Sequence, residues 1–371
     1  MMDTQFFKSF QAPRLPFLHR EESMLGLDMG ASSMKLVQVR LSHERAVLET
    51  YGELATGPYG SKGVGQGVRL SGRKAQEAIV DLVRETGATA KEAVAAIPLH
   101  HSFVTMVELP RMQQKDLESA IRYEARRYVP IPLTEVEVDW WHIPEEATNE
   151  ENTIATPTKE TVQVLLVAVS KEILAKYKAI VTDAGLSLHA LEIETFGAIR
   201  SVMGRERSGV LFVDFGAVTT KMTILEQGVV RASHSIDKGA QDITLTLAES
   251  LGIEFERAEI MKREVGMTPR AEHQETIKVV TPLVDYVFIE LERFVVDYTE
   301  RYKRAVAKIY IVGGGALLPG LRDAMVKKFG VEVLVGTPFA RVQYPAFFEP
   351  VLREIGPSFS VAVGLALRGL T

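Results

Sequence analysis

Apolar and polar residues alternate along the first patterned part of the chain, which predicts β-strands. The segments MLGLDMG, MKLVQVRL and AVLETYGEL, which begin at Met24, Met34 and Ala46, are separated by turn signals. SGRKAQEAIVDLVRETG then has the period of an amphipathic helix that ends at Gly87. The glycines before this helix lack the spacing of a phosphate-binding loop and favour a flexible surface loop. They are Gly60, Gly63, Gly65, Gly67 and Gly72.

The order of predicted strands and helices divides the rest of the chain into blocks. Residues 94–191 read as strand, helix, strand, strand, helix and strand, which predicts a compact α+β subdomain inserted into the first domain. The last segment, PSFSVAVGLALRGL, is a small-residue helix opening at Pro357, a favoured first helical position. We expect an N-terminal tail (1–23), a first domain (24–93), the inserted subdomain (94–191), a connecting helix (192–208), a second domain (209–340) and a C-terminal part of the first domain (341–371).

Composition narrows the classes of function. The 371 residues include no cysteine, which excludes disulfides, thiolate metal sites and thiol nucleophiles. A formal net charge of −5 argues against nucleic acid as a partner, because phosphate binding needs a clustered basic surface. The longest apolar run, from Val162 to Val169, is too short to cross a bilayer. We therefore expect a cytoplasmic, soluble protein.

One segment of the chain occurs twice. LGLDMGASSMKLVQ, starting at Leu25, aligns without gaps on LFVDFGAVTTKMTI, starting at Leu211. Each copy is a strand ending in Asp-x-Gly, a turn of small residues and a second strand. The matching positions are Asp28 with Asp214, Gly30 with Gly216, Ala31 with Ala217 and Lys35 with Lys221.

The repeated unit has the chemistry of a phosphate site. A carboxylate at a strand end can hold Mg²⁺ through water, since this ion keeps much of its hydration shell. Glycine lets the backbone approach an anion closely, and small residues leave amide N–H groups directed at phosphate oxygens. Two such hairpins facing each other would clamp a triphosphate from both sides. The alternative is that each Asp-x-Gly is a plain hairpin turn.

A third element, KIYIVGGGALLPGLRDAM, runs from a buried strand into Gly313, Gly314 and Gly315 and then into a helix. Bare backbone and a helix N-terminus favour close approach to a nucleotide. The pattern is not the dinucleotide fingerprint, because Leu318 stands where its third glycine is required. A P-loop is excluded, because the chain contains no Gly-Lys pair.

Two hairpins followed by a strand and three glycines resemble the nucleotide motifs of the actin, Hsp70 and sugar-kinase superfamily. This resemblance implies an α/β fold of two ribonuclease-H-like domains around a nucleotide cleft, with ATP and Mg²⁺ as cofactors. Asp28 and Asp214 would hold the metal. The resemblance places the nucleotide against Gly30, Ala31, Ser32, Ser33 and Lys35 of the first hairpin, Gly216, Ala217, Thr219 and Thr220 of the second, Gly239, Glu259 and Lys262 of the following helices, and Gly313, Gly314 and Gly315.

The block 94–191 indicates the branch of this superfamily. The run LESAIRYEARRYVPIPLTEVEVDW and the segment ALEIETFGAIR resemble the PilM family of type IV pilus assembly proteins, and the matches span residues 24–370. The resemblance implies a scaffold that binds the N-terminal peptide of a PilN-like inner-membrane protein and links that membrane platform to the pilus motor ATPases. The chain would reach the inner membrane only through this partner. Self-association is a further expectation.

Of the expected activities, ATP hydrolysis has the weakest support from the sequence. A catalytic residue must orient water at the γ-phosphate, and in this superfamily it can come from the connecting helix, which makes Glu194 the candidate and Glu192 the next. We expect ATP binding with at most slow hydrolysis. The alternatives are an FtsA-like membrane-associated cell-division ATPase and a metabolic phosphotransferase of the sugar-kinase type. No basic amphipathic helix follows the last segment and no acceptor-site motif is recognisable, which disfavours both.

Overall fold

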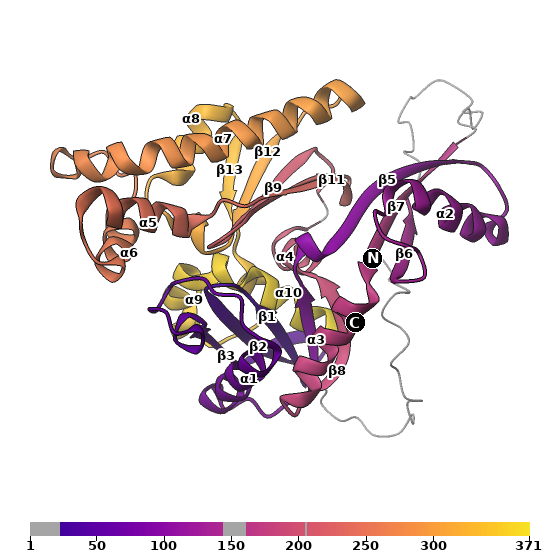
Figure 1. Ribbon diagram of the computed structural model, residues 1–371, viewed down its shortest axis with the longest axis horizontal. Helices are drawn as coiled ribbons and strands as arrows, with labels where there is room; N and C mark the ends of the chain where they lie inside the picture. Colours follow the sequence, from indigo (N-terminus) through magenta and orange to yellow (C-terminus); the bar gives the residue numbers. More distant parts are fainter. Residues whose placement is uncertain (1–22, 144–160, 205) are drawn as a thin grey trace.

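The computed structural model describes residues 23–143, 161–204 and 206–371. Apart from Ser23, the expected N-terminal tail lies outside the described residues. Within these ranges the strands form two five-stranded sheets and one three-stranded sheet. In Figure 1 the first sheet lies in the lower part of the molecule, the second in the upper part, and the three-stranded sheet to the right.

The first sheet has the order β3-β2-β1-β4-β8. Its strands are β1 (Ser23–Met29), β2 (Ser33–Ser42), β3 (Arg45–Ala55), β4 (Glu92–Ile97) and β8 (Ser187–Ile193). The two faces of β2 bury alternate residues, as a strand requires. Leu36 packs with α1 (Gly72–Thr86) and α3 (Lys171–Asp183), whereas Val37 packs with α10 (Ser360–Gly369). Helix α1 ends at Gly87, which adopts the left-handed conformation with a φ of 62°, as predicted.

The second sheet repeats the first. Its order is β11-β10-β9-β12-β13, and in both sheets the first three strands of the chain pair antiparallel while the last two add in parallel. The strands are β9 (Val210–Phe215), β10 (Thr220–Glu226), β11 (Val229–Ile236), β12 (Lys308–Val312) and β13 (Glu332–Val335). The duplication read from the sequence thus extends to sheet topology.

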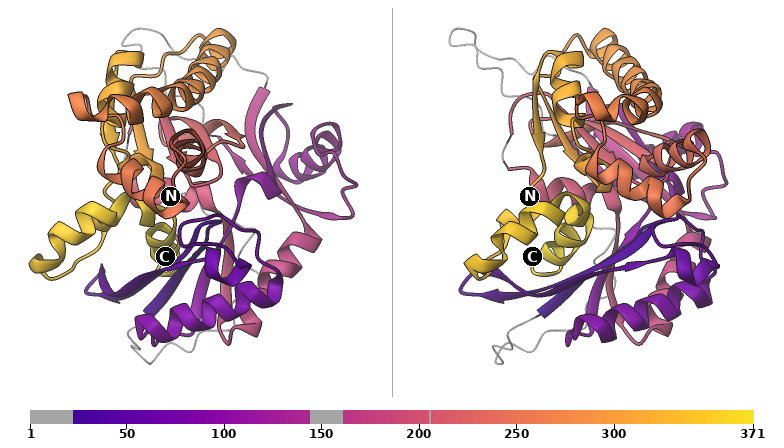
Figure 2. Two further views of the ribbon diagram at one scale, coloured as in Figure 1. Left: turned by 60° about the vertical axis from the view of Figure 1, so that its left-hand side comes forward. Right: turned by 90° about the vertical axis from the view of Figure 1, so that its left-hand side faces the viewer.

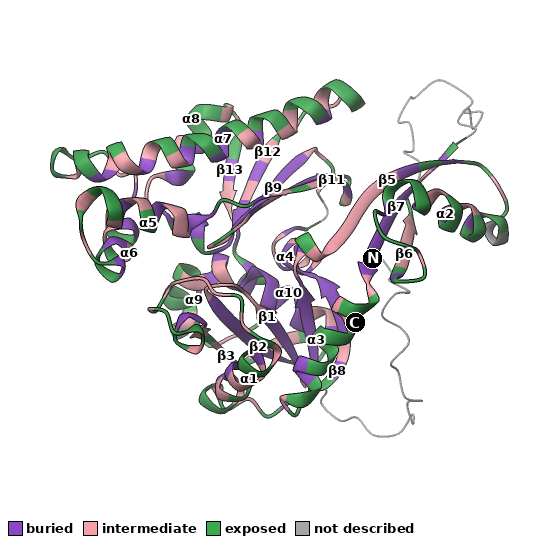
Figure 3. Cartoon of the chain, viewed as in Figure 1, coloured by how far each residue is buried: buried purple, intermediate pink, exposed green. Residues whose placement is uncertain are grey.

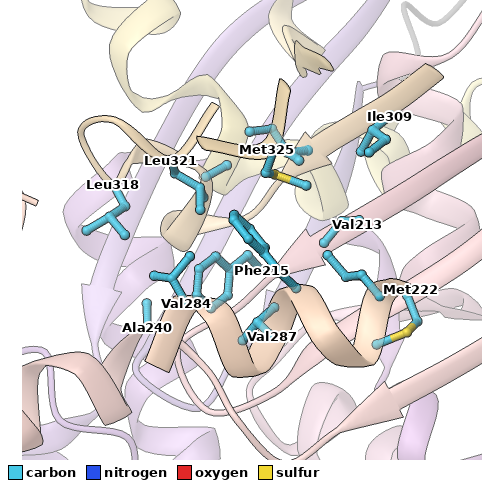
Figure 4. Packing of buried hydrophobic residues seen from close by; sticks show 14 of the residues in the cluster. Val213, Phe215, Met222, Ala240, Val284, Val287, Ile309, Leu318, Leu321 and Met325 are labelled. Carbon is cyan, nitrogen blue, oxygen red and sulfur yellow. The ribbon is translucent and has the colours of Figure 1, made fainter. Parts of the chain in front are cut away.

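Helices cover the second sheet on its outer face. They are α5 (Ala240–Leu251), α6 (Phe255–Glu264), α7 (Gln274–Tyr302) and α8 (Leu321–Phe329). Figure 4 shows the core beneath them, where Val213, Phe215 and Met222 of the sheet meet Val284 and Val287 of α7. Figure 3 shows the exposed outward faces of α7 and α8, and the strands β9 and β10 beneath the helices are almost entirely buried.

The three-stranded sheet has the order β5-β7-β6 and carries α2 on one face. Its elements are β5 (Ser102–Pro110), α2 (Gln114–Tyr128), β6 (Val136–His142) and β7 (Thr161–Ser170). This subdomain is narrower than the expected range 94–191, because β4 and β8 pair with each other inside the first sheet and α3 packs on that sheet. Leu117, Ile121 and Ala125 of α2 are core residues.

Two helices cross at the junction of the sheets. Helix α4 (Glu194–Val202) packs against α10 so closely that a Cβ on Gly364 would lie 1.7 Å from the carbonyl oxygen of Gly197. The core around them includes Val94 of the first sheet, Phe212 of the second and Leu165 of the three-stranded sheet. Helix α9 (Glu349–Ile355) and a 3₁₀ turn over Gly356–Phe359 precede α10, so Pro357 lies in this turn and not at the start of the helix. Figure 2 shows α9 and α10 in yellow between the two domains.

Candidate functional site

The two repeated hairpins have the same turn geometry. Asp28 pairs in register with Lys35, and Asp214 pairs in register with Lys221. A Cβ on Gly30 would lie 2.7 Å from the carbonyl oxygen of Ser33, and one on Gly216 would lie 2.8 Å from that of Thr219. Both turns therefore close over a backbone oxygen that only glycine can approach this way.

Between the hairpins lies a buried charged cluster. Lys221 Nζ lies 2.8 Å from Glu194 Oε2 and 3.0 Å from Asp214 Oδ2. Burial would lower the pKa of Lys221, but Asp214 and Glu194 outweigh it and raise the pKa above its ordinary value. Burial raises the pKa of Asp28 to about 6, Lys35 and Lys221 opposing the rise and Glu194 and Asp214 adding to it. The carboxylates of both repeats thus lie within electrostatic reach of each other, as the clamp hypothesis requires.

Lys35 has different partners from its counterpart. Its Nζ donates to Ser33 Oγ at 2.6 Å and lies 3.2 Å from Glu53 Oε1 in β3. In the second hairpin the Thr220 hydroxyl donates to the carbonyl oxygen of Lys238 at 2.7 Å. Two of the hydroxyls expected at the phosphates are therefore engaged with the protein. Ser32 and Thr219 contribute backbone carbonyls, which accept from Thr56 and Gly216 respectively.

The start of α5 packs directly on the second turn. A Cβ on Gly239 would lie 2.4 Å from the carbonyl oxygen of Ala217, and that oxygen accepts a hydrogen bond from the N–H of Gln241 at 2.8 Å. Lys262 Nζ in α6 donates to Glu259 Oε2 at 2.6 Å and to the Ala240 carbonyl at 3.2 Å. The structure therefore brings Gly239 and the Glu259–Lys262 pair to the same end of the second domain.

Burial would raise the pKa of Glu259, but Lys262, Thr244 and Arg263 outweigh it and hold that pKa below its ordinary value. Glu259 is therefore an anion engaged by both neighbouring cations. A ribose hydroxyl would have to share it with these cations.

The glycine triplet begins at the end of β12, beside the second Asp-x-Gly. Gly313 has a φ of 83°, and a Cβ there would lie 2.4 Å from Asp214 Oδ1. A Cβ on Gly315 would lie 2.6 Å from the Phe215 ring, whereas one on Gly314 would meet nothing within 4 Å. Gly313 and Gly315 thus allow close packing against β9, whereas the space beside Gly314 is open.

Sequence reasoning missed the role of the glycine-rich loop between β3 and α1. The N–H of Gly67 donates to Gln241 Oε1 of α5 at 2.5 Å, and a Cβ on Gly67 would lie 2.7 Å from Val218 Cγ2. The N–H of Val68 donates to the Ala31 carbonyl at 2.9 Å. The loop therefore spans from the first hairpin to the second domain. Its five glycines were the available signal, but nothing local in the sequence shows what they touch.

Glu194 and Glu192 have separate surroundings. Glu194 Oε1 accepts from the N–H of Leu99 at 2.8 Å, so both of its carboxylate oxygens are engaged. Glu192 forms a two-pronged ion pair with Arg200 at 2.6 and 2.7 Å and also accepts from Arg368. Glu194 lies in the cluster between the hairpins, and Glu192 lies at the α4–α10 crossing. Lys221, which no site prediction included, is the residue that joins Glu194 to Asp214.

Within the described ranges, no three His, Cys, Asp or Glu side chains gather as a metal-binding group. Across the same part of the chain, no helix combines the length and hydropathy needed to span a membrane.

The family model for type IV pilus assembly protein PilM matches residues 26–370. The chain belongs to the PilM family. The PilM chain of a solved PilM–PilN type IV pilus biogenesis complex superimposes on this PilM family member with a TM-score of 0.77 and 27% identity, covering 95% of this chain and 100% of that one. This match confirms the expected actin-like fold.

This PilM family member also has more distant similarities to other proteins. The ethanolamine utilization protein EutJ of Salmonella typhimurium is 30% identical over 173 residues, which are 46% of this chain and 54% of EutJ, so the chain spans about half the length of this relative. The structure of MreB 5 of Spiroplasma citri bound to AMPPNP matches with a TM-score of 0.51 and 13% identity over 94% of this chain and 96% of that one. This second likeness shows the fold alone.

Proposed function

We propose that this PilM family member is an ATP-binding scaffold of type IV pilus assembly that captures the cytoplasmic N-terminal peptide of a PilN-like inner-membrane protein. The observation that carries the proposal is the superposition on PilM from the PilM–PilN complex over 95% of this chain. The superposed length is great enough to include the three-stranded subdomain with α2. The chain would work in the cytoplasm at the inner face of the membrane, held there by its partner and linking it to the pilus motor ATPases.

Nucleotide binding is supported by the arrangement of the two hairpins. Asp28 and Asp214 bring carboxylates from both domains to the same cluster, and Gly30 and Gly216 turn the backbone beside them. This donor set fits Mg²⁺, which takes one or two carboxylates together with phosphate oxygens and water. Bound Mg²⁺ would neutralise phosphate charge between the domains. Asp28 and Asp214 would hold it, mainly through its water shell.

Slow turnover follows from the surroundings of Glu194. Each of its oxygens already accepts a hydrogen bond, from Leu99 and from Lys221, so the carboxylate is held in place and cannot turn freely toward an attacking water. ATP in this site would act chiefly by holding the two domains together. The second candidate function, phosphoryl transfer to a small molecule, has no observation in its favour.

The decisive experiment is a binding titration. A labelled synthetic peptide copying the cytoplasmic N-terminus of the organism's own PilN-like protein is titrated with the full chain and followed by fluorescence polarisation, with and without Mg-ATP. We expect saturable binding, whereas a scrambled peptide of the same composition should not bind. Equal signals from both peptides would refute the scaffold. Light scattering on the same sample reports whether copies of the chain associate.

A further inference from the structure

Lys221 is a buried cation placed between the repeated hairpins. Its side chain is only 11% exposed, and the Glu194 and Asp214 side chains that it contacts are each 9% exposed. A lysine ammonium has three N–H donors. The two carboxylates take two of them, which leaves one N–H for a further acceptor.

The internal repeat gives Lys221 a counterpart. Lys35 occupies the same register position in the first hairpin, opposite Asp28, as Lys221 does in the second, opposite Asp214. Cross-strand partners lie on the same face of a hairpin, so each lysine shares a face with its own Asp. The repeat therefore places one lysine beside the Asp-x-Gly of each domain.

The buried cluster around Lys221 contains more negative than positive groups. Lys221 contacts two carboxylates, Asp214 and Glu194, Asp28 lies within their electrostatic reach, and Lys35 is drawn toward Glu53 on the first-domain side. A nucleotide triphosphate placed here adds several more negative charges in a site largely shielded from water, where uncompensated charge is costly. Lys221 holds one positive charge at this position, so it offsets part of the added negative charge.

We propose that Lys221 is a nucleotide-binding residue that donates its remaining N–H to a phosphate oxygen from the second domain, opposite Lys35. Its ion pair with Glu194 aims the ammonium group and, at the same time, ties the phosphates to the first turn of α4. Binding of phosphate would thereby affect the contacts of α4 at the junction of the two domains. This inference rests on the proposed ATP binding.

The alternative role for Lys221 is purely structural, in which it only neutralises Asp214 and Glu194. The two roles differ in their dependence on phosphate and on metal. A phosphate contact weakens ATP and ADP binding but leaves adenosine binding unchanged, and it does so with or without Mg²⁺. A residue that only positions Asp214 for the metal affects ATP binding when Mg²⁺ is present and not in EDTA.

The test is calorimetric titration of the full chain with ATP, ADP and adenosine, in Mg²⁺ and in EDTA. We expect Lys221→Met to lose roughly tenfold to a hundredfold in ATP affinity under both conditions, the scale of one hydrogen bond to a charged group. Lys221→Arg should recover most of the loss. Lys308→Met is the matched control, since Lys308 is also ion-paired, 3.0 Å from Glu206, on another strand of the same sheet.

The outcomes separate this inference from the proposed function. If the native chain binds no ATP, the proposed function fails. If the native chain binds ATP and Lys221→Met binds it equally well, or loses affinity only in Mg²⁺, the phosphate contact is refuted. Because removal of a buried cation leaves two carboxylates unpaired, Lys221→Met is also compared in a Glu194→Gln background with Glu194→Gln alone. A loss in that pair supports the contact, and equal affinities refute it.

Discussion

Gly67 and Gln241 join the two domains by a single hydrogen bond, from the Gly67 N–H to the Gln241 side-chain oxygen at 2.5 Å. Gly67 belongs to the loop between β3 and α1. Gln241 lies at the start of α5, which packs on the turn of the second hairpin. The same loop touches α6, because a Cβ on Gly63 would lie 2.4 Å from Glu256 and one on Gly65 would lie 3.9 Å from Glu259 Cγ. The loop therefore crosses from one domain to the other beside the residues expected at the phosphates and ribose.

This contact predicts that the loop slows nucleotide exchange. In Gly67→Val the new side chain would clash with Val218 and Gln241, so the loop should lift from the second domain. Nucleotide should then dissociate several-fold faster, since one hydrogen bond and its packing are lost. The measurement is stopped-flow release of a fluorescent ATP analogue. Lys62→Ala, in an exposed part of the same loop, should not change the rate. Unchanged release from both Gly67→Val and Gln241→Ala would exclude this role.

The ion pairs of Glu192 predict a large effect on stability. Glu192 is 1% exposed and engages Arg200 and Arg368, which ties β8 to α4 and α10. Glu192→Gln removes the negative charge that both guanidinium groups engage, and breaking a buried pair in this way costs about 3 kcal/mol in the free energy of unfolding. Urea unfolding measures it. Glu77→Gln, in an exposed pair with Lys74, is the control, because ion pairs held in water contribute little to stability. Equal losses in the two variants would contradict the prediction.

The surface of α2 predicts where a partner peptide binds. Leu117 and Ile121 are in the core, so the side chains that α2 can offer are exposed ones such as Tyr123, Arg126 and Arg127. Charge reversal of both arginines to Glu should weaken peptide binding by about tenfold and leave ATP affinity unchanged, because neither arginine belongs to a hairpin of the nucleotide site. Fluorescence polarisation and calorimetry measure the two affinities. Reversal at Arg353 and Arg301, which lie on other elements, is the control, and unchanged peptide affinity in the α2 variant would remove this helix face from the interface.

Much of the fold could be predicted because the sequence contains an internal repeat. The repeat around Asp28 and Asp214 identified two hairpins, and the structure confirms that they occupy the same place in two sheets of the same order. A three-stranded sheet with α2 lies within the range 94–191 that the sequence assigns to an inserted subdomain. Strands β4 and β8 flank it and pair with each other from Glu92↔Ser187 to Ile97↔Ile193. No local pattern distinguishes such flanking strands from the strands of the insertion itself.

The site was less predictable, because its decisive contacts join residues far apart in the chain. Lys221 was aligned with Lys35, but only the folded chain shows that its partner is Glu194 in the connecting helix. The glycines between β3 and α1 are visible in the sequence, but their spacing does not show that Gly67 binds Gln241, which lies in another domain. A periodic pattern reports which face of an element is buried, and it does not report what lies against that face.

The raised pKa of Asp28 predicts that one substitution acts in opposite directions on stability and on binding. In the folded chain this carboxyl has a pKa of about 6, against 3.8 as its ordinary value, so the folded state holds the proton more tightly than the unfolded chain. Stability must therefore fall as pH rises from about 4 to about 6, and above that range ionisation of the buried carboxyl lowers stability by about 3 kcal/mol. Asp28→Asn removes this charge.

We therefore expect nucleotide-free Asp28→Asn, in EDTA at pH 7.5, to unfold at a higher temperature than the native chain, and the difference to shrink at pH 4.5. The same variant should bind Mg-ATP more weakly, because a carboxylate that faces the metal has been lost. Asp214→Asn is the matched comparison. It takes one of two carboxylates from Lys221, so it should weaken Mg-ATP binding and also lower stability. Thermal unfolding and calorimetry measure both properties, and the account of Asp28 fails if Asp28→Asn is destabilised at pH 7.5 as Asp214→Asn is.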